Sequence, residues 1–97
     1  MVSISSYLYI VKEMFVGRCR DESNKFNLIK TIFALSSVVM CKENCHSISD
    51  CTAFDYSSEG DCNLYRGGPY TQSDGISNID CYLLTGIVVG YAITENK

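Results

Sequence analysis

Residues 41–56 read CKENCHSISDCTAFDY, and their spacing decides the fold of this chain. Cys41 and Cys45 are one helical turn apart, so both would lie on the same face of a helix. Residues 51–56 then show the alternation that is typical of a strand. The stretch therefore predicts a short helix that presents two cysteines and leads into a strand beginning with a third.

The predicted helix has recognisable ends. Ser36 and Ser37 each offer an N-cap, because a serine hydroxyl accepts a hydrogen bond from a free amide of the first turn. We expect the helix to run from about Val38 to His46, where polar residues follow. Val38 shares the face of the two cysteines, and this face is predicted to pack on a sheet.

The strand that follows the helix is predicted to have a partner. Residues 57–61 form a turn in which Gly60 can take a positive φ, and residues 62–65 return as the second strand of a hairpin. Within the first strand, Phe54 and Tyr56 lie on one side and are interpreted as core residues.

The other segments are less distinctive. Residues 26–35 fit both a helical stripe and a strand, and we predict a loop that enters a strand. Residues 66–69 end the second strand of the hairpin. A polar loop is predicted around Gly75, and residues 79–84 are predicted to form the last strand. The pattern predicts an α+β fold, a small disulfide-rich domain with one helix packed on an antiparallel sheet.

Composition limits the function classes. The chain has 97 residues, enough for one domain, and six cysteines, which is typical of a domain held by disulfides outside the cell. Its net charge of −3 comes from interspersed residues of both signs, with no run of lysine or arginine. Nucleic-acid binding and a polybasic membrane patch are therefore not expected.

The two ends of the chain are apolar. Residues 7–11 alternate in the manner of a strand, and residues 1–16 lack the basic start and cleavage site of a signal peptide. We therefore expect part of a larger multidomain protein. Residues 82–93 are shorter than the roughly 20 residues that span a bilayer, so we expect no direct membrane insertion, although a truncated anchor is the alternative. The predicted domain is residues 1–84, with residues 85–97 an apolar tail or an extra strand.

Three kinds of chemistry compete for the cysteines. Zinc needs four ligands, and Cys41, Cys45 and His46 offer only one half-site without a second close pair. A cysteine nucleophile needs a histidine base, and His46, the one histidine, is better explained as a helix-end residue. The acids, such as Asp50, Asp55 and Glu59, are interpreted as loop and surface groups. We therefore expect no enzyme activity, no cofactor and no metal.

Disulfides remain as the preferred use of the cysteines. Because Cys41 and Cys45 are one turn apart, they more naturally reach different partners on the sheet. Six cysteines allow 15 pairings, and spacing alone does not choose among them.

Four motifs occur in a fixed order along the chain. They are Gly17-Arg18-Cys19-Arg20-Asp21, then Cys41-x3-Cys45-x5-Cys51-x-Ala-Phe-x-Tyr, then Gly60-Asp61-Cys62-x-Leu-Tyr, and finally Cys81-Tyr82. Together they resemble a PAN/apple domain over roughly residues 15–84. The resemblance implies a five-stranded antiparallel sheet that cradles one helix. It also implies three disulfides, Cys41–Cys62, Cys45–Cys51 and Cys19–Cys81.

The resemblance further implies a non-catalytic extracellular module for adhesion, one that binds a protein or carbohydrate partner. Heparin-like polyanions are disfavoured, because the chain has no basic cluster. A freestanding secreted effector or inhibitor is the alternative, and a structural zinc domain is a weaker one. For the ligand contact, the sequence offers Tyr65, Arg66 and Tyr70, residue types common at interface hot spots. The competing interpretation is that Tyr65 belongs to the core and Tyr70 covers the sheet edge.

Overall fold

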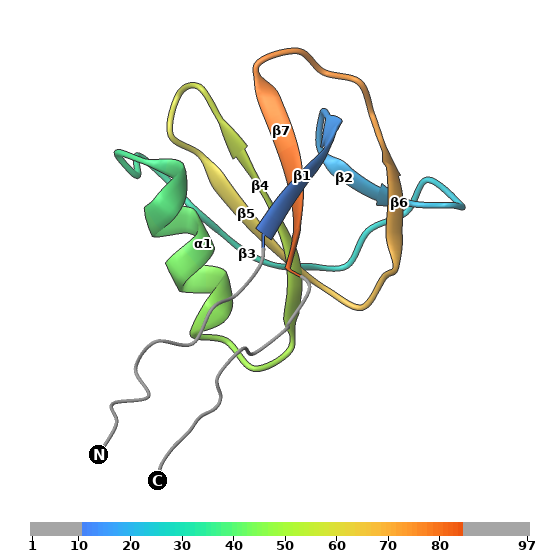
Figure 1. Cartoon of the computed structure of the whole chain (residues 1–97), viewed down its shortest axis with the longest axis horizontal. Helices are drawn as coiled ribbons and strands as arrows, with labels where there is room; N and C mark the ends of the chain where they lie inside the picture. Colours follow the sequence, from blue (N-terminus) through green and yellow to red (C-terminus); the bar gives the residue numbers. More distant parts are fainter. Residues whose placement is uncertain (1–10, 85–97) are drawn as a thin grey trace, which may run out of the picture.

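The computed structural model describes residues 11–84, which form two antiparallel sheets and one helix. The larger sheet has five strands in the order β1-β7-β4-β5-β3. Their bounds are β1 (Val11–Val16), β7 (Ile79–Leu84), β4 (Cys51–Ser57), β5 (Cys62–Arg66) and β3 (Leu28–Ile32). The helix α1 (Val38–His46) lies along one face of this sheet (Figure 1). The predicted fold class is confirmed.

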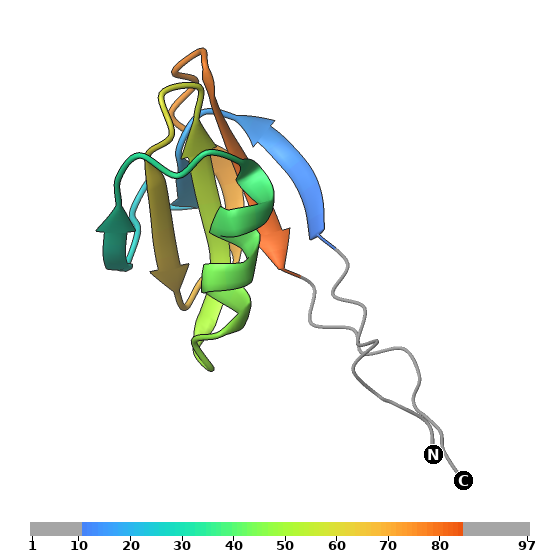
Figure 2. The same cartoon turned by 90° about the vertical axis from the view of Figure 1, so that its left-hand side faces the viewer.

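A second, two-stranded sheet covers the opposite face. It consists of β2 (Cys19–Asp21) and β6 (Tyr70–Ser73), which pair in antiparallel fashion. Figure 2 shows α1 in front of the larger sheet and, on its far side, the short and partly hidden β2 strand; the long blue strand at the right is β1. The sequence did not predict this sheet, because β2 and β6 have only three and four residues and more than fifty residues separate the paired Cys19 and Ser73.

The helix forms where its sequence signals lie. Ser37 is the N-cap in extended conformation, and its hydroxyl accepts a hydrogen bond from the amide of Met40 at 3.3 Å. Cys41 and Cys45 are fully buried on the face that meets the sheet. The predicted start, end and buried face of the helix are confirmed.

The core has two parts, one on each face of the larger sheet. On the helix side, Phe54 and Leu64 are fully buried, and the ring of Phe54 stacks on Tyr82 with centroids 5.0 Å apart. On the other side, Ala53 and Tyr65 pack beneath β2 and β6. The central strand β4 is therefore covered on both faces, which explains why its side chains are buried almost without alternation.

Three disulfides connect these layers. Cys41–Cys62 joins α1 to β5, Cys45–Cys51 joins the end of α1 to β4, and Cys19–Cys81 joins β2 to β7. Their Cα atoms lie 5.6, 5.3 and 5.1 Å apart, in the usual range for disulfides. These are the pairs that the family resemblance implies. Each layer that covers the five-stranded sheet is thus covalently attached to it.

The ambiguous segment at residues 26–35 is a loop that enters β3, as predicted. Of the strand predicted at residues 7–11, Val11 begins β1, whereas residues 7–10 and the predicted tail or anchor at residues 85–97 lie outside the described residues. Within residues 11–84, no helix has the length and apolar character needed to cross a membrane.

Candidate binding site

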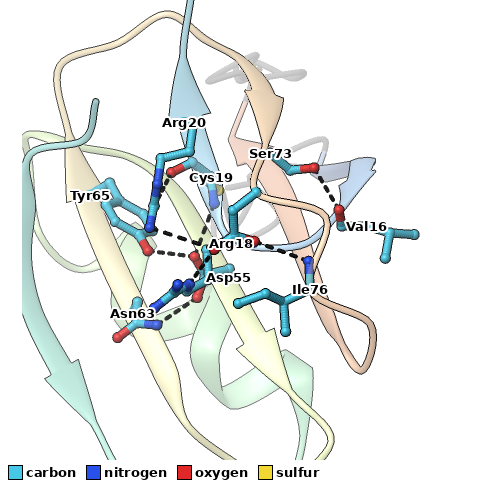
Figure 3. A network of polar contacts seen from close by, with 10 residues as sticks. Val16, Arg18, Cys19, Arg20, Asp55, Asn63, Tyr65, Ser73 and Ile76 are labelled. Carbon is cyan, nitrogen blue, oxygen red and sulfur yellow. Dashed lines mark hydrogen bonds and ion pairs between the residues drawn. The ribbon is translucent and has the colours of Figure 1, made fainter. Parts of the chain in front are cut away.

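Asp55 is fully buried near the middle of β4, so its interpretation as a surface group is wrong. One carboxylate oxygen accepts hydrogen bonds from the amide of Cys19 at 3.1 Å and the hydroxyl of Tyr65 at 2.5 Å. The other accepts from the side-chain amide of Asn63 at 2.7 Å, and Figure 3 shows Asp55 enclosed by these partners (Figure 3). The alternation of β4 places Asp55 on the face that β2 covers, which is the physical reason for its burial.

Burial sets the proton affinity of this site. Desolvation raises the pKa of Asp55 above its ordinary value, although the hydrogen bonds from Tyr65 and Asn63 oppose the rise. Burial next to this carboxylate also raises the pKa of the Tyr65 hydroxyl. Because every side-chain oxygen of Asp55 has a partner, the group holds β2, β4 and β5 together and is not open to a ligand.

A second set of charges secures the smaller sheet. The backbone amide and the Nε of Arg18 donate to Asp74 at 2.8 and 2.5 Å, and a terminal nitrogen of Arg20 lies 3.7 Å from the same carboxylate. Burial opposes ionisation of Asp74, but the hydrogen bonds from Arg18 outweigh it and hold the pKa of Asp74 below its ordinary value. Arg20 is buried and lies over the ring of Phe26, 4.1 Å from its centroid. These cations have internal partners, so we interpret the cluster as structural.

Two of the three predicted contact residues belong to the core. Tyr65 and Tyr70 expose only 2% and 4% of their surface. The Tyr65 hydroxyl donates to Asp55, whereas the Tyr70 hydroxyl donates to the carbonyl of Arg66 and accepts from the amide of Asn27. Their rings pack against each other under the smaller sheet, with centroids 5.6 Å apart. The burial of these two tyrosines favours the competing interpretation that they belong to the core, although Tyr70 also lines the pocket described next, and Arg66 alone of the three is exposed.

A pocket lies beside the same segment. It has a volume of about 240 Å³ and is lined by Thr52, Gly67, Pro69, Tyr70, Leu83 and Leu84. The connection from β5 to β6 forms one wall, and the end of β7 forms another. The φ of Gly68 is +101°, and a Cβ there would lie 3.0 Å from the Tyr70 ring, so the wall needs glycine at this position.

The polar side chains around the pocket are already paired. The Thr52 hydroxyl donates to the carbonyl of Gly67 at 2.9 Å, and the Tyr70 hydroxyl has the two partners described above. The sequence does not predict this pocket, because Thr52, Leu83 and Leu84 are brought next to the turn at Gly67 only by the pairing of β4 with β5 and β7. The motif at residues 65–70 was the one available signal.

One exposed ion pair lies at the same end of the sheet. The Nε of Arg66 is 3.0 Å from a carboxylate oxygen of Asp50, and the side chains are 45% and 56% exposed. Gly67, which lines the pocket, directly follows Arg66, and Asp50 stands two residues before Thr52. An exposed pair of this kind contributes at most about 1 kcal/mol to stability. Its charges therefore remain accessible to a partner.

A metal centre needs several ligating side chains close together. Among residues 11–84, no three histidine, cysteine, aspartate or glutamate side chains come together in a group that could hold a metal ion. All six cysteines are in disulfides. His46, a candidate ligand in the half-site that the sequence offers for zinc, ends the helix beside Cys45, which is bonded to Cys51.

Comparison with known proteins gives one match. A family model described as PAN domain matches residues 17–85, more than half of the chain. No curated protein and no solved structure matches the chain. The matched range runs from the turn before β2 through the whole of β7 and includes all six cysteines.

Proposed function

The chain belongs to the PAN domain family, and from this membership we propose that it is a non-catalytic module that binds a protein or carbohydrate partner outside the cell. PAN domains are binding modules of extracellular proteins, and they generally have no catalytic role. The observation that carries the proposal is the match over residues 17–85, together with the three disulfides that it encloses.

The disulfides support an extracellular location. All three are buried between the sheet and the layers that cover it, so they are part of the core. Structural disulfides of this kind form and persist in oxidising compartments such as the secretory pathway and the extracellular space. We therefore propose that the domain is secreted or displayed at the cell surface within a larger multidomain protein.

Asp55 and Asp74 are both held in structural contacts within the domain. A general acid or base must reach the proton that it transfers. Asp55 is enclosed by three donors, and Asp74 is held by Arg18. The raised pKa of Asp55 therefore has a structural explanation and does not mark a reactive group.

The proposal is tested with the oxidised, purified chain on two arrays, one of glycans and one of displayed peptides and protein domains. We expect saturable binding on at least one array that is lost when the same protein is reduced and alkylated. The reduced protein is the matched control, because it has the same sequence and, after neutral alkylation, nearly the same charge. Failure to bind on both arrays would contradict a recognition role.

A further inference from the structure

We propose that the pocket beside the β5–β6 connection receives one apolar side chain of a protein partner, and that Arg66 pairs with an acidic residue next to it. This inference rests on the proposed function and deepens it, because it selects protein over carbohydrate. Three properties of the site carry it: its size, the state of its polar groups, and the charge at its edge.

The size of the pocket fits a single side chain. Its volume of about 240 Å³ is below the range of about 300–1,000 Å³ that is typical of pockets for whole small molecules. A closed apolar cavity of about 150 Å³ is enough to hold a benzene ring. One leucine or phenylalanine side chain is therefore the largest group that the pocket can enclose well.

The polar groups of the lining favour an apolar occupant. The Thr52 hydroxyl is committed to the Gly67 carbonyl, and the Tyr70 hydroxyl is committed to Arg66 and Asn27. Leu83, Leu84 and Pro69 supply carbon surface. A sugar ring would bring several hydroxyls that need directed partners, and burying them unpaired would cost free energy. An apolar side chain makes no such demand.

The charge at the edge of the pocket specifies its neighbour. Arg66 uses only its Nε for Asp50, and in the described part of the chain the two terminal nitrogens of its guanidinium have no partner. Those nitrogens can bind a carboxylate in the parallel, two-bond geometry that arginine favours. A partner with an aspartate or glutamate beside the buried side chain would complement this arrangement. Apolar anchors with a charged rim are the usual organisation of protein interfaces.

The test is a selection of short random peptides, displayed on phage, against the whole oxidised chain. We expect the selected peptides to share an apolar residue beside an aspartate or glutamate. A labelled selected peptide is then titrated against the wild type and three variants. We expect Thr52→Trp, which fills the pocket entrance, to weaken binding by more than about tenfold. We expect Arg66→Gln to weaken it by about three- to tenfold, mainly at low salt.

Lys30→Gln is the matched control for charge, because Lys30 is exposed on β3 and is not part of the pocket lining. This variant should bind as the wild type does.

Backbone amide NMR shifts of the wild type provide a readout that does not depend on any variant folding. The selected peptide should shift the amides of Gly67, Leu83 and Leu84.

Five outcomes would overturn the inference. Four of them are selected peptides without an apolar residue, amide shifts that map elsewhere, equal binding by all variants, and NOEs in the free protein that place residues 85–97 in the pocket. The fifth is binding on a glycan array without any selected peptide, which would leave the proposed function intact. Absence of binding to both peptides and glycans would instead contradict the proposed function.

Discussion

Replacing Asp55 with alanine should remove the main polar connection between the two sheets. The carboxylate accepts from the backbone of β2 through Cys19, and from Asn63 and Tyr65 on β5. In Asp55→Ala these three donors lose their acceptor. Because Asp55 is fully buried, water does not replace the lost partners without opening the structure.

The magnitude follows from the cost of unpaired buried groups. A buried donor left without a partner costs about 1–3 kcal/mol. The three donors are neighbours, so their individual costs do not add fully. We expect a loss of about 3–5 kcal/mol in the free energy of unfolding, a large part of the roughly 5–15 kcal/mol that is typical of a domain.

The assay is urea denaturation at neutral pH with the disulfides intact. At an m value of about 2 kcal/mol per molar, the midpoint should fall by about 2 M. Asp50→Ala is the control, because it removes the same carboxylate from an exposed ion pair and should cost at most about 1 kcal/mol. Asp55→Asn should be intermediate, because its one oxygen still accepts while its amide faces a donor, Asn63. Equal midpoints for Asp55→Ala and Asp50→Ala would refute the structural role of the network.

Three further predictions concern acid, reduction and backbone geometry. The pKa of Asp74 is lowered in the folded state, so its contribution is present above its ordinary pKa and lost as the pH falls. Asp74→Asn should therefore flatten the fall in stability below about pH 4, and an unchanged acid profile in urea titrations would contradict this. Full reduction should unfold the domain, because loops of 62, 21 and 6 residues contribute about 4, 3 and 2 kcal/mol on the chain-entropy model, although overlap reduces their sum. An unchanged cooperative melt by circular dichroism after reduction would be evidence against it. Gly60→Ala should destabilise more than Gly75→Ala, since both have positive φ but a Cβ at Gly60 would lie 2.7 Å from the Leu35 carbonyl, whereas Gly75 has open space. Equal urea midpoints for the two alanine variants would refute the contact argument.

Local signals explain what the sequence could predict. The helix from Val38 to His46 was predicted because its cap, its cysteine phase and its end all lie within a dozen residues. The hairpin of β4 and β5 has a similarly local origin, in the turn at Gly60. Such elements depend on few contacts between distant parts of the chain.

The smaller sheet depends on long-range pairing and was therefore missed. Cys19 on β2 lies opposite Ser73 on β6, more than fifty residues away, and the two strands have only three and four residues. Asp55 was misplaced for the same reason. Alternation along β4 shows that Asp55 and Phe54 face opposite ways, but it does not show that another sheet covers the second face. The buried position of Tyr70 likewise depends on β6, whose pairing with β2 the sequence does not show.

The arrangement of layers limits where a partner can bind. The helix covers one face of the five-stranded sheet, and β2 and β6 cover the other. At one edge, β3 carries the exposed Lys30, and a lysine on an edge strand opposes the addition of another strand. The end of the sheet near Arg66 differs from this edge. There the chain turns at Gly67 and Gly68, which have positive φ, beside a pocket that no described side chain fills. If the proposed function is correct, changes at exposed positions of this end, such as Arg66, should alter binding with little effect on the fold.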